Sequence, residues 1–118
     1  MITENELEEI TSSLLIGITV GVGSLVLLFS SGARVLVQCT FQCGKEGQKK
    51  MGHGEKIMTS VLLFPFLNKK IKQANMLDGS ILKLVLSDDE QLCIIPENNG
   101  FESYVITTSY GEYPVMTY

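Results

Sequence analysis

The chain has 118 residues, of which 45% are hydrophobic and 19% charged, and its net charge is -4. These values predict a single folded domain, residues 1–118, with its own hydrophobic core, and they argue against a disordered chain and against a protein that binds nucleic acid directly. An odd number of cysteines, three, and an acidic N-terminus in place of a positively charged signal sequence favour a reduced, cytoplasmic protein.

The charges are segregated along the chain. Residues 1–33 carry four acids and no base, and residues 34–83 carry all nine basic residues against three acids. Residues 84–118 carry six acids and no base. Acidic ends therefore flank a basic middle, which favours electrostatic steering of a charged partner, although an ordinary solvated surface has such a composition too.

The first segment predicts a short helix over residues 3–13. Thr3 and Glu6 form a capping-box pattern, and apolar residues follow at helical spacing. An uncharged run from Ile10 to Ala33 comes next, and it is long enough to span a bilayer. Its internal pattern decides between a membrane helix and strands.

Within the uncharged run the pattern is that of strands. Large residues at the even positions of 16–22 alternate with glycine or threonine, and this period of two describes a strand with one large and one small face. The alternation resumes twice, so we expect strands at 15–22, 24–31 and 34–42. The glycines lack the spacing, and the following helix, of a dinucleotide-binding loop.

A repeat supports this interpretation. The segment GSLVLLFSSGARVLV at 23–37 reappears as GSILKLVLSDDEQLCI at 79–94, with its large residues offset by 57 positions. The later copy is too highly charged for a backbone that faces lipid, so neither copy is expected to cross a membrane. The repeat predicts a three-stranded unit at about 15–42 and again at 69–95, with a bulge or altered turn where the Gly-Ser pairs slip by one residue.

Between the two copies the sequence predicts a loop and a small helix. Residues 43–55 contain four glycines and three lysines and are expected to form a mobile loop. A short helix begins at Ile57 and does not contain Pro65 in its interior, and Phe64 and Phe66 are expected to fill the core.

The second group of strands is expected at 69–77, 80–87 and 91–95, followed by a C-terminal hairpin within 101–118. Seven or eight strands with one or two small helices predict a mainly β (α+β) fold. We expect an antiparallel β-sandwich or half-barrel built from the duplicated three-stranded unit, with a short N-terminal helix and one small helix in the middle.

Few residues have the arrangement that catalysis or metal binding requires. His53 is the only histidine, and its flexible surroundings oppose a rigid Cys–His pair with Cys39 or Cys43. The cysteines lack a second pair for zinc, and the acids at 88–90 lack the alternate spacing of a calcium loop. We therefore expect no enzymatic activity, no metal and no cofactor.

Six segments occur in order along the chain: L-x-G at 15–17, GSLVLLFSSGARVLV, HGEKIM, FPFLNKKI, DGSILKLVLSDDEQLCI and GFESYVI. Together they cover about residues 14–110 and resemble immunity proteins of bacterial polymorphic toxin systems, in particular those of contact-dependent growth inhibition. The resemblance implies a cytoplasmic protein that binds the C-terminal toxin domain of an incoming effector, commonly a nuclease, and blocks its active site.

The resemblance supplies no catalytic motif, so charge and expected exposure select the contact residues. An acidic surface would meet the basic cleft of a nuclease-like toxin domain, and a buried tyrosine would slow its release. The expected partner-binding residues are Asp88, Asp89, Glu90, Glu97, Glu102 and Tyr104.

An alternative function is a small β domain that binds an anionic ligand through the lysines of 45–56 near His53, or that acts as a structural or interaction module. Neither alternative involves a membrane or direct contact with nucleic acid. The sequence leaves the oligomeric state and the identity of the toxin open.

Overall fold

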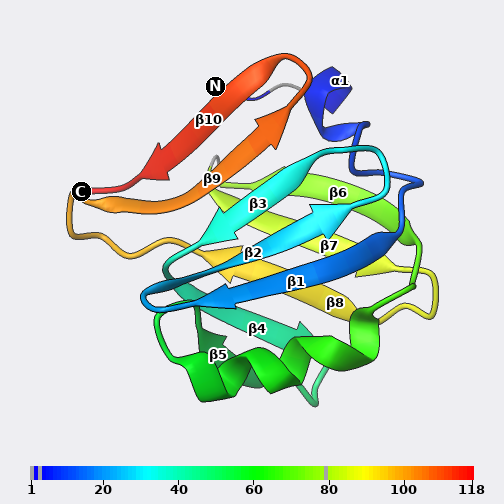
Figure 1. Cartoon of the computed structure of the whole chain (residues 1–118), viewed down its shortest axis with the longest axis horizontal. Helices are drawn as coiled ribbons and strands as arrows, with labels where there is room; N and C mark the ends of the chain where they lie inside the picture. Colours follow the sequence, from blue (N-terminus) through cyan, green and yellow to red (C-terminus); the bar gives the residue numbers. More distant parts are fainter. Residues whose placement is uncertain (1, 3, 79) are drawn as a thin grey trace.

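The computed structural model of the chain describes residues 2, 4–78 and 80–118. Within these residues, ten strands form two antiparallel five-stranded sheets, accompanied by two small helices (Figure 1). This arrangement confirms the predicted mainly β, sandwich-like fold. The predicted capping box depends on Thr3, which lies outside the described residues.

The elements in chain order are α1 (Glu4–Leu7), β1 (Leu15–Gly21), β2 (Ser24–Phe29), β3 (Arg34–Val37), β4 (Thr40–Gly44), β5 (Lys50–His53), the 3₁₀ helix η1 (Ile57–Phe66), β6 (Ile71–Leu77), β7 (Ile81–Leu86), β8 (Gln91–Ile95), β9 (Glu102–Thr108) and β10 (Gly111–Met116). The uncharged run at the start of the chain thus contains the β1–β2 hairpin, as predicted. No helix in the described part of the chain is both long and apolar enough to cross a membrane.

Each sheet contains one three-stranded unit, β1–β2–β3 in the first and β6–β7–β8 in the second, although the predicted first copy, 15–42, runs into β4 of the second sheet. The first sheet has the order β1-β2-β3-β9-β10 and the second has the order β5-β4-β8-β7-β6. The first strand of each copy carries a register shift at the same place, between Leu15 and Gly17 and between Ile71 and Gln73. Each copy is extended by a hairpin that follows the other copy in the chain, so the hairpins β4–β5 and β9–β10 are exchanged.

The repeat extends further toward the N-terminus than the sequence pattern predicted. The buried residues Leu7 and Ile10 lie eight and five positions before the buried Leu15 of β1. Leu63 and Phe66 of η1 are buried and have the same spacing to Ile71 of β6. The segment that contains α1 is therefore the counterpart of η1.

The backbone joins the two copies by matched hydrogen bonds. The Ser12 amide donates to the Ile71 carbonyl oxygen at 2.8 Å, and the Asn68 amide donates to the Leu15 carbonyl oxygen at 2.7 Å. Ser12 and Asn68 also share a left-handed backbone, with φ of 70° and 67°. Because both positions serve the same junction, the fold has an internal two-fold relation.

The core lies between the sheets and follows the predicted period of two. In the middle strand of each copy, alternate side chains point inward and are almost completely buried: Leu25, Leu27 and Phe29 in β2, and Leu82, Leu84 and Leu86 in β7. Burying a side chain of this size contributes about 1.5–3 kcal/mol. The alternation in the sequence therefore identified the main source of stability correctly.

The predicted strand at 34–42 is two strands that belong to different sheets. β3 ends at Val37, β4 begins at Thr40, and the two residues between them carry the chain across the sandwich. The alternation survives the crossing because Val37, Cys39 and Phe41 all face the core. A period of two cannot reveal a change of sheet when the inward side is kept.

The predicted mobile loop at 43–55 is largely a β-hairpin, because β5 pairs with β4. Two of its glycines, Gly52 and Gly54, are closely covered by other segments. A Cβ atom at Gly52 would lie 2.3 Å from the Phe41 ring, so the ring covers a position that only glycine can occupy.

The middle helix also differs from the prediction. It is a 3₁₀ helix that includes Pro65, and Phe64 is about half exposed whereas Phe66 is buried. A 3₁₀ helix repeats every three residues, which places Phe66 on the core side with Ser60 and Leu63 and places Phe64 on another side. The N-terminal α-helix is shorter than predicted and ends at Leu7.

Candidate partner-binding surface

The acids of the β7–β8 turn are close together, but lysines form ion pairs with them and offset most of their negative charge. Lys69 Nζ contacts the Asp88 carboxylate and lies 3.0 Å from Glu90 Oε2. Lys72 Nζ lies 2.9 Å from Asp89 Oδ1. The hydrogen bond from Lys69 lowers the pKa of Asp88, and the same carboxylates raise the pKa of Lys69. This turn is an ion-pair network that carries only a small excess of negative charge.

Replacing Lys69 by methionine is expected to lower the free energy of unfolding by about 0.5–1 kcal/mol near neutral pH, the range of exposed ion pairs. The methionine keeps an apolar stem beside Phe66, whose ring lies under Lys69 Nζ. Because the pKa of Asp88 is lower in the folded protein, the stabilisation is present above its ordinary value of 3.8 and is lost as the pH falls through the folded value.

Urea denaturation at about pH 7 and about pH 2 measures this effect, and the two proteins should differ much less at the acidic pH. The matched control is Lys45→Met in the β4–β5 hairpin, which should show no such dependence on pH. If the Lys69 variant were less stable than the original chain by the same free energy of unfolding at both pH values, the ion-pair interpretation would be contradicted.

The other predicted contact residues do not join these acids in one surface. Asp88–Glu90 directly precede the N-terminal end of β8. Glu97 follows the C-terminal end of β8, and Glu102 begins β9. Glu102 is exposed and pairs with Met116 of β10. The predicted acidic patch is therefore divided between two ends of the sandwich.

The prediction that Tyr104 contacts a partner is wrong. Its side chain is 0% exposed, and burial raises its pKa. Its hydroxyl donates to the Ser80 carbonyl oxygen and lies 3.3 Å from the sulfur of Met76, so it bridges from β9 to the second sheet. Tyr104 pairs with Val37, which faces the core, and this register directs its ring inward.

His53 is fully engaged within the protein. Its Nε2 atom lies 2.9 Å from Glu97 Oε1, and its Nδ1 atom accepts a hydrogen bond from the Glu55 amide at 3.1 Å. Both ring nitrogens therefore have partners within the protein, and the contact with Glu97 ties the end of β5 to the connection after β8.

The cysteines are core residues. Burial raises the pKa of Cys39 to about 12 and that of Cys43 to about 11, so both remain thiols near neutral pH. In the described part of the chain, no group of three or more His, Cys, Asp or Glu side chains is placed to hold a metal ion.

The most conspicuous exposed feature is an apolar side of η1, which the sequence pattern did not predict. Residues three apart lie in one row on a 3₁₀ helix. One such row points away from the core and is apolar throughout, with exposed fractions from 83% at Met58 to 37% at Leu67. We call this the η1 row, and it consists of Met58, Val61 and Phe64 of η1 and of Leu67, which directly follows the helix.

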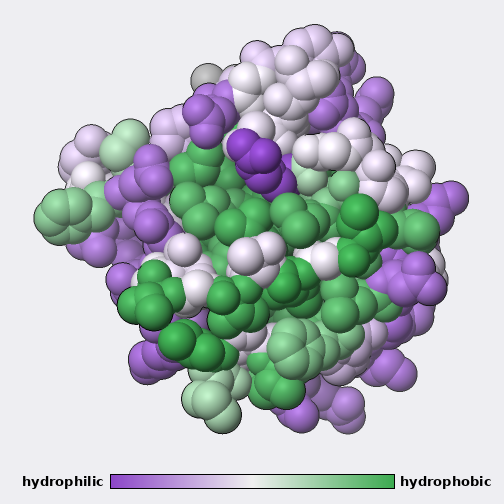
Figure 2. Space-filling model, viewed as in Figure 1, coloured by the Kyte–Doolittle hydropathy of each residue, from purple (hydrophilic) through white to green (hydrophobic). Residues whose placement is uncertain are grey.

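The η1 row continues onto the first sheet. β1 is the edge strand next to η1, and it exposes Ile16 and Val20. Beyond it, Val26, Leu28 and Leu36 form the outer side of β2 and β3, opposite the core. Figure 2 shows these elements as one broad hydrophobic area seen from the viewpoint of Figure 1. We call the η1 row together with Ile16, Val26, Leu28 and Leu36 the apolar face. Val20 is not part of it, because it pairs with the core-facing Leu25 and lies on the inner side of β1.

The apolar face has a charged border and a hollow beside it. A groove of about 500 Å³ lies beside η1, and its lining includes Val61, Leu62 and Phe66 together with the charged Lys45, Lys50 and Glu90. Apolar side chains at the centre and charged side chains at the rim are the usual organisation of a protein–protein interface. Of the predicted contact residues, Glu90 belongs to this border.

A contiguous exposed apolar area of this kind marks an interaction site more often than an ordinary surface. Its residues lie on regular elements whose inner sides are anchored in the core, so the surface is held in shape before any partner arrives.

Comparisons with protein-family models, with curated proteins and with solved structures gave no match.

Proposed function

We propose that this protein is an immunity protein, which binds a cognate bacterial toxin domain in the cytoplasm and neutralises it by covering its active site. The observation that carries the proposal is the apolar face, which offers a preformed protein-binding surface. The segments that resemble immunity proteins of contact-dependent growth inhibition include HGEKIM and FPFLNKKI, and these overlap the two ends of η1.

The apolar face and the acids have separate roles in this proposal. Burial of Val61 and Phe64 against the toxin supplies affinity, because apolar and aromatic side chains at the centre of an interface carry most of the binding free energy. The acids at the border, among them Glu90, and the acidic residues elsewhere accelerate encounter with a basic, nuclease-like domain.

The test uses the C-terminal domain of the secreted effector that is encoded beside this chain in its native genome. We expect the two proteins to form a complex with a nanomolar dissociation constant, measured by isothermal titration calorimetry, and we expect co-expression to restore growth of cells that produce the toxin domain. The association rate should fall as salt is added.

A native genome without such an effector, or a toxin domain that neither binds this chain nor loses its toxicity, would contradict the proposal. Binding without protection would show an interaction module in place of an inhibitor. The alternative of an anionic ligand is less well supported, because His53 already pairs with Glu97, and Lys49 lies 3.9 Å from Glu46.

A further inference from the structure

In the described part of the chain, the two sheets end in four edge strands, and three of these carry a feature that hinders pairing with another strand. β10 has Pro114 in its middle, and proline has no amide hydrogen to donate. β5 has only four residues and packs against η1. β6 carries the charged Lys72, whose Nζ lies 2.9 Å from Asp89 Oδ1. β1 is the fourth edge strand, and it has neither a charge nor a proline (Figure 1).

The internal repeat allows β1 and β6 to be compared position by position. Leu15 corresponds to Ile71, because each precedes the register shift of its strand. This offset of 56 positions is one smaller than that between β2 and β7, because the turn that follows is one residue longer in the second copy. Ile16 therefore occupies the place of Lys72, and its side chain is 58% exposed. The first copy thus has an exposed apolar residue where the second copy has a charge that keeps other strands away.

The backbone of β1 has hydrogen-bonding groups that point away from β2. Gly21 pairs with Ser24 across the two-residue turn of the hairpin, so Gly21 and Thr19 exchange their backbone hydrogen bonds with β2. The amides and carbonyl groups of Ile18 and Val20 alternate with these and point to the edge of the sheet. Nothing in the described part of the chain forms a hydrogen bond with them.

This edge is open although η1 also packs against β1. The segment after η1 occupies only the start of the edge, where the Leu15 amide donates to the Lys69 carbonyl oxygen at 3.1 Å. Farther along the strand, Thr19 is exposed on the outer side. Val20 lies on the core side and is still 38% exposed, so η1 does not cover this part of the edge.

The sequence along this edge is almost the same in both directions. Residues 16–22 are I-G-I-T-V-G-V, with Thr19 at the centre, a glycine two positions to each side, and isoleucine or valine elsewhere. When two copies pair antiparallel about Thr19, Ile18 of one copy lies opposite Val20 of the other, and the glycines lie opposite each other. Each Ile18–Val20 pair then exchanges two backbone hydrogen bonds. No like charges meet, because residues 10–33 carry none.

We propose that the edge of β1 pairs with the edge of β1 in a second copy of this chain, about a two-fold axis at Thr19, so that the two first sheets join into one continuous sheet. On the core side of the strand pair, Ile18 and Val20 of both copies pack together and cover the part of Val20 that is exposed in the single chain. The two Thr19 side chains lie opposite each other on the outer side, a favourable cross-strand pair.

The interface is small, which sets the expected affinity. One pair of short strands buries less than the roughly 1,200 Å² of a standard interface, so we expect a dissociation constant on the order of 100 μM. Pairing in the plane of the sheet leaves Val26, Leu28 and Leu36 of the apolar face uncovered on the outer side. The inference is therefore compatible with the proposed function and does not rest on it.

The first test uses the full chain alone at concentrations from about 10 μM to about 1 mM, a range that spans the expected dissociation constant. Sedimentation velocity should show a change from monomer to dimer over this range. Amide hydrogen exchange followed by NMR should slow at Ile18 and Val20 as the concentration rises, because their amides become bonded. Ala74 and Met76 are the corresponding residues of β6, and their amides should exchange at the same rate throughout.

The second test places charges at the two-fold axis. Thr19→Lys brings two lysines opposite each other and should weaken the dimer about tenfold, and Thr19→Asp should do the same. An equimolar mixture of the two variants should dimerise again, because lysine then lies opposite aspartate. The matched control is Asn75→Lys, since Asn75 is the exposed counterpart of Thr19 in β6, and it should dimerise as the original chain does.

A chain that stays monomeric at about 1 mM, or exchange at Ile18 and Val20 that does not depend on concentration, would overturn the proposal. Equal losses in Thr19→Lys and Asn75→Lys, or no recovery in the mixture, would also overturn it. The measurements on the original chain decide the question whether or not a variant folds. None of these results depends on a toxin domain, so a failure here is distinct from a failure of the proposed function.

Discussion

An alanine at position 54 is expected to destabilise the protein strongly. A Cβ atom there would lie 2.1 Å from the Val37 carbonyl oxygen and 2.6 Å from the Val37 carbonyl carbon. Both contacts are to backbone, so no side-chain rotation relieves them. Gly54 also donates its amide to the Cys39 carbonyl oxygen at 2.9 Å, at the point where the chain crosses between sheets.

We expect Gly54→Ala to lower the free energy of unfolding by about 3 kcal/mol or more, at the upper end of the range for overpacked sites. The total stability of a domain is only about 5–15 kcal/mol, so this is a large part of it. Urea denaturation followed by circular dichroism measures the change.

The matched control is Gly21→Ala. Gly21 ends β1, and the nearest heavy atom to an added Cβ is the Ser24 carbonyl oxygen at an ordinary contact distance of 3.7 Å. We expect its stability to change by no more than about 0.5–1 kcal/mol. If Gly54→Ala were as stable as Gly21→Ala, the close approach of residue 54 to β3 would be refuted.

Introducing a charge at the centre of the η1 row is expected to have the largest effect on binding. Val61→Glu places a carboxylate where the partner would bury apolar surface, and an unpaired buried charge is costly. We expect the affinity for the toxin domain to fall about 100-fold or more, mainly through faster dissociation. Calorimetry measures the affinity, and surface plasmon resonance measures the dissociation rate.

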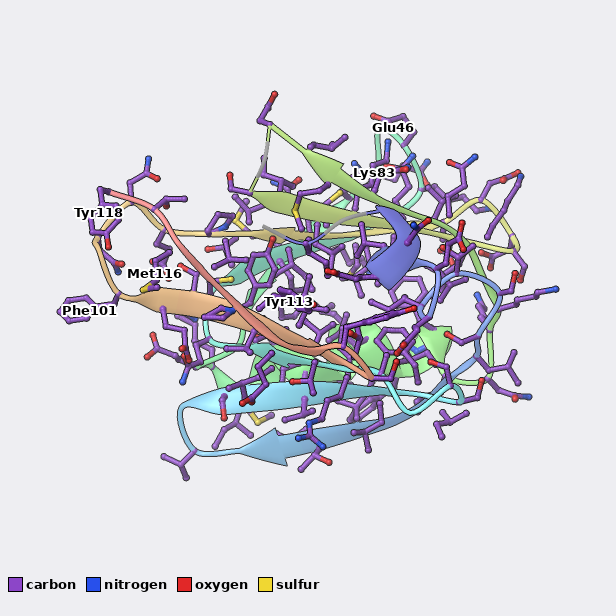
Figure 3. All side chains as sticks on the ribbon, turned by 90° about the horizontal axis from the view of Figure 1, so that it is seen from above. Glu46, Lys83, Phe101, Tyr113, Met116 and Tyr118 are labelled. Carbon is purple, nitrogen blue, oxygen red and sulfur yellow. The ribbon has the colours of Figure 1, made fainter. Side chains whose placement is uncertain are left out.

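Because Val61 is 56% exposed, the substitution should change the melting temperature little. Phe101→Glu is the matched control, since Phe101 is also exposed and lies at the same end of the molecule as Tyr118 in Figure 3. It should leave the affinity nearly unchanged. Equal losses in the two variants, or none in Val61→Glu, would show that the partner does not use the apolar face.

The sequence by itself determined the elements whose burial repeats with a fixed period. The alternation of Leu25, Leu27 and Phe29 could be interpreted as a half-buried strand because neighbouring side chains point to opposite sides of a sheet. The offset of 57 residues then identified β7 as a second copy of β2. The acids of the β7–β8 turn were also placed together correctly, because they are adjacent in the chain.

Other features depend on which segments meet in space, and only the tertiary structure decided them. Tyr104 faces inward because β9 pairs with β3 in one register, and a shift by one residue would have turned it outward. Gly52 and Gly54 indicate a loop when considered alone, but they are required by the Phe41 ring and by the backbone of β3.

The candidate binding surface belongs to this second class. Nearly every residue from 57 to 67 is apolar, so composition cannot say which side of the helix is buried. Packing against β1 and β5, together with the three-residue repeat of a 3₁₀ helix, buries Leu63 and Phe66 and leaves Val61 and Phe64 exposed. The sequence specified how much apolar surface the chain has, and the contacts between the sheets and η1 decided which part of it remains available to a partner.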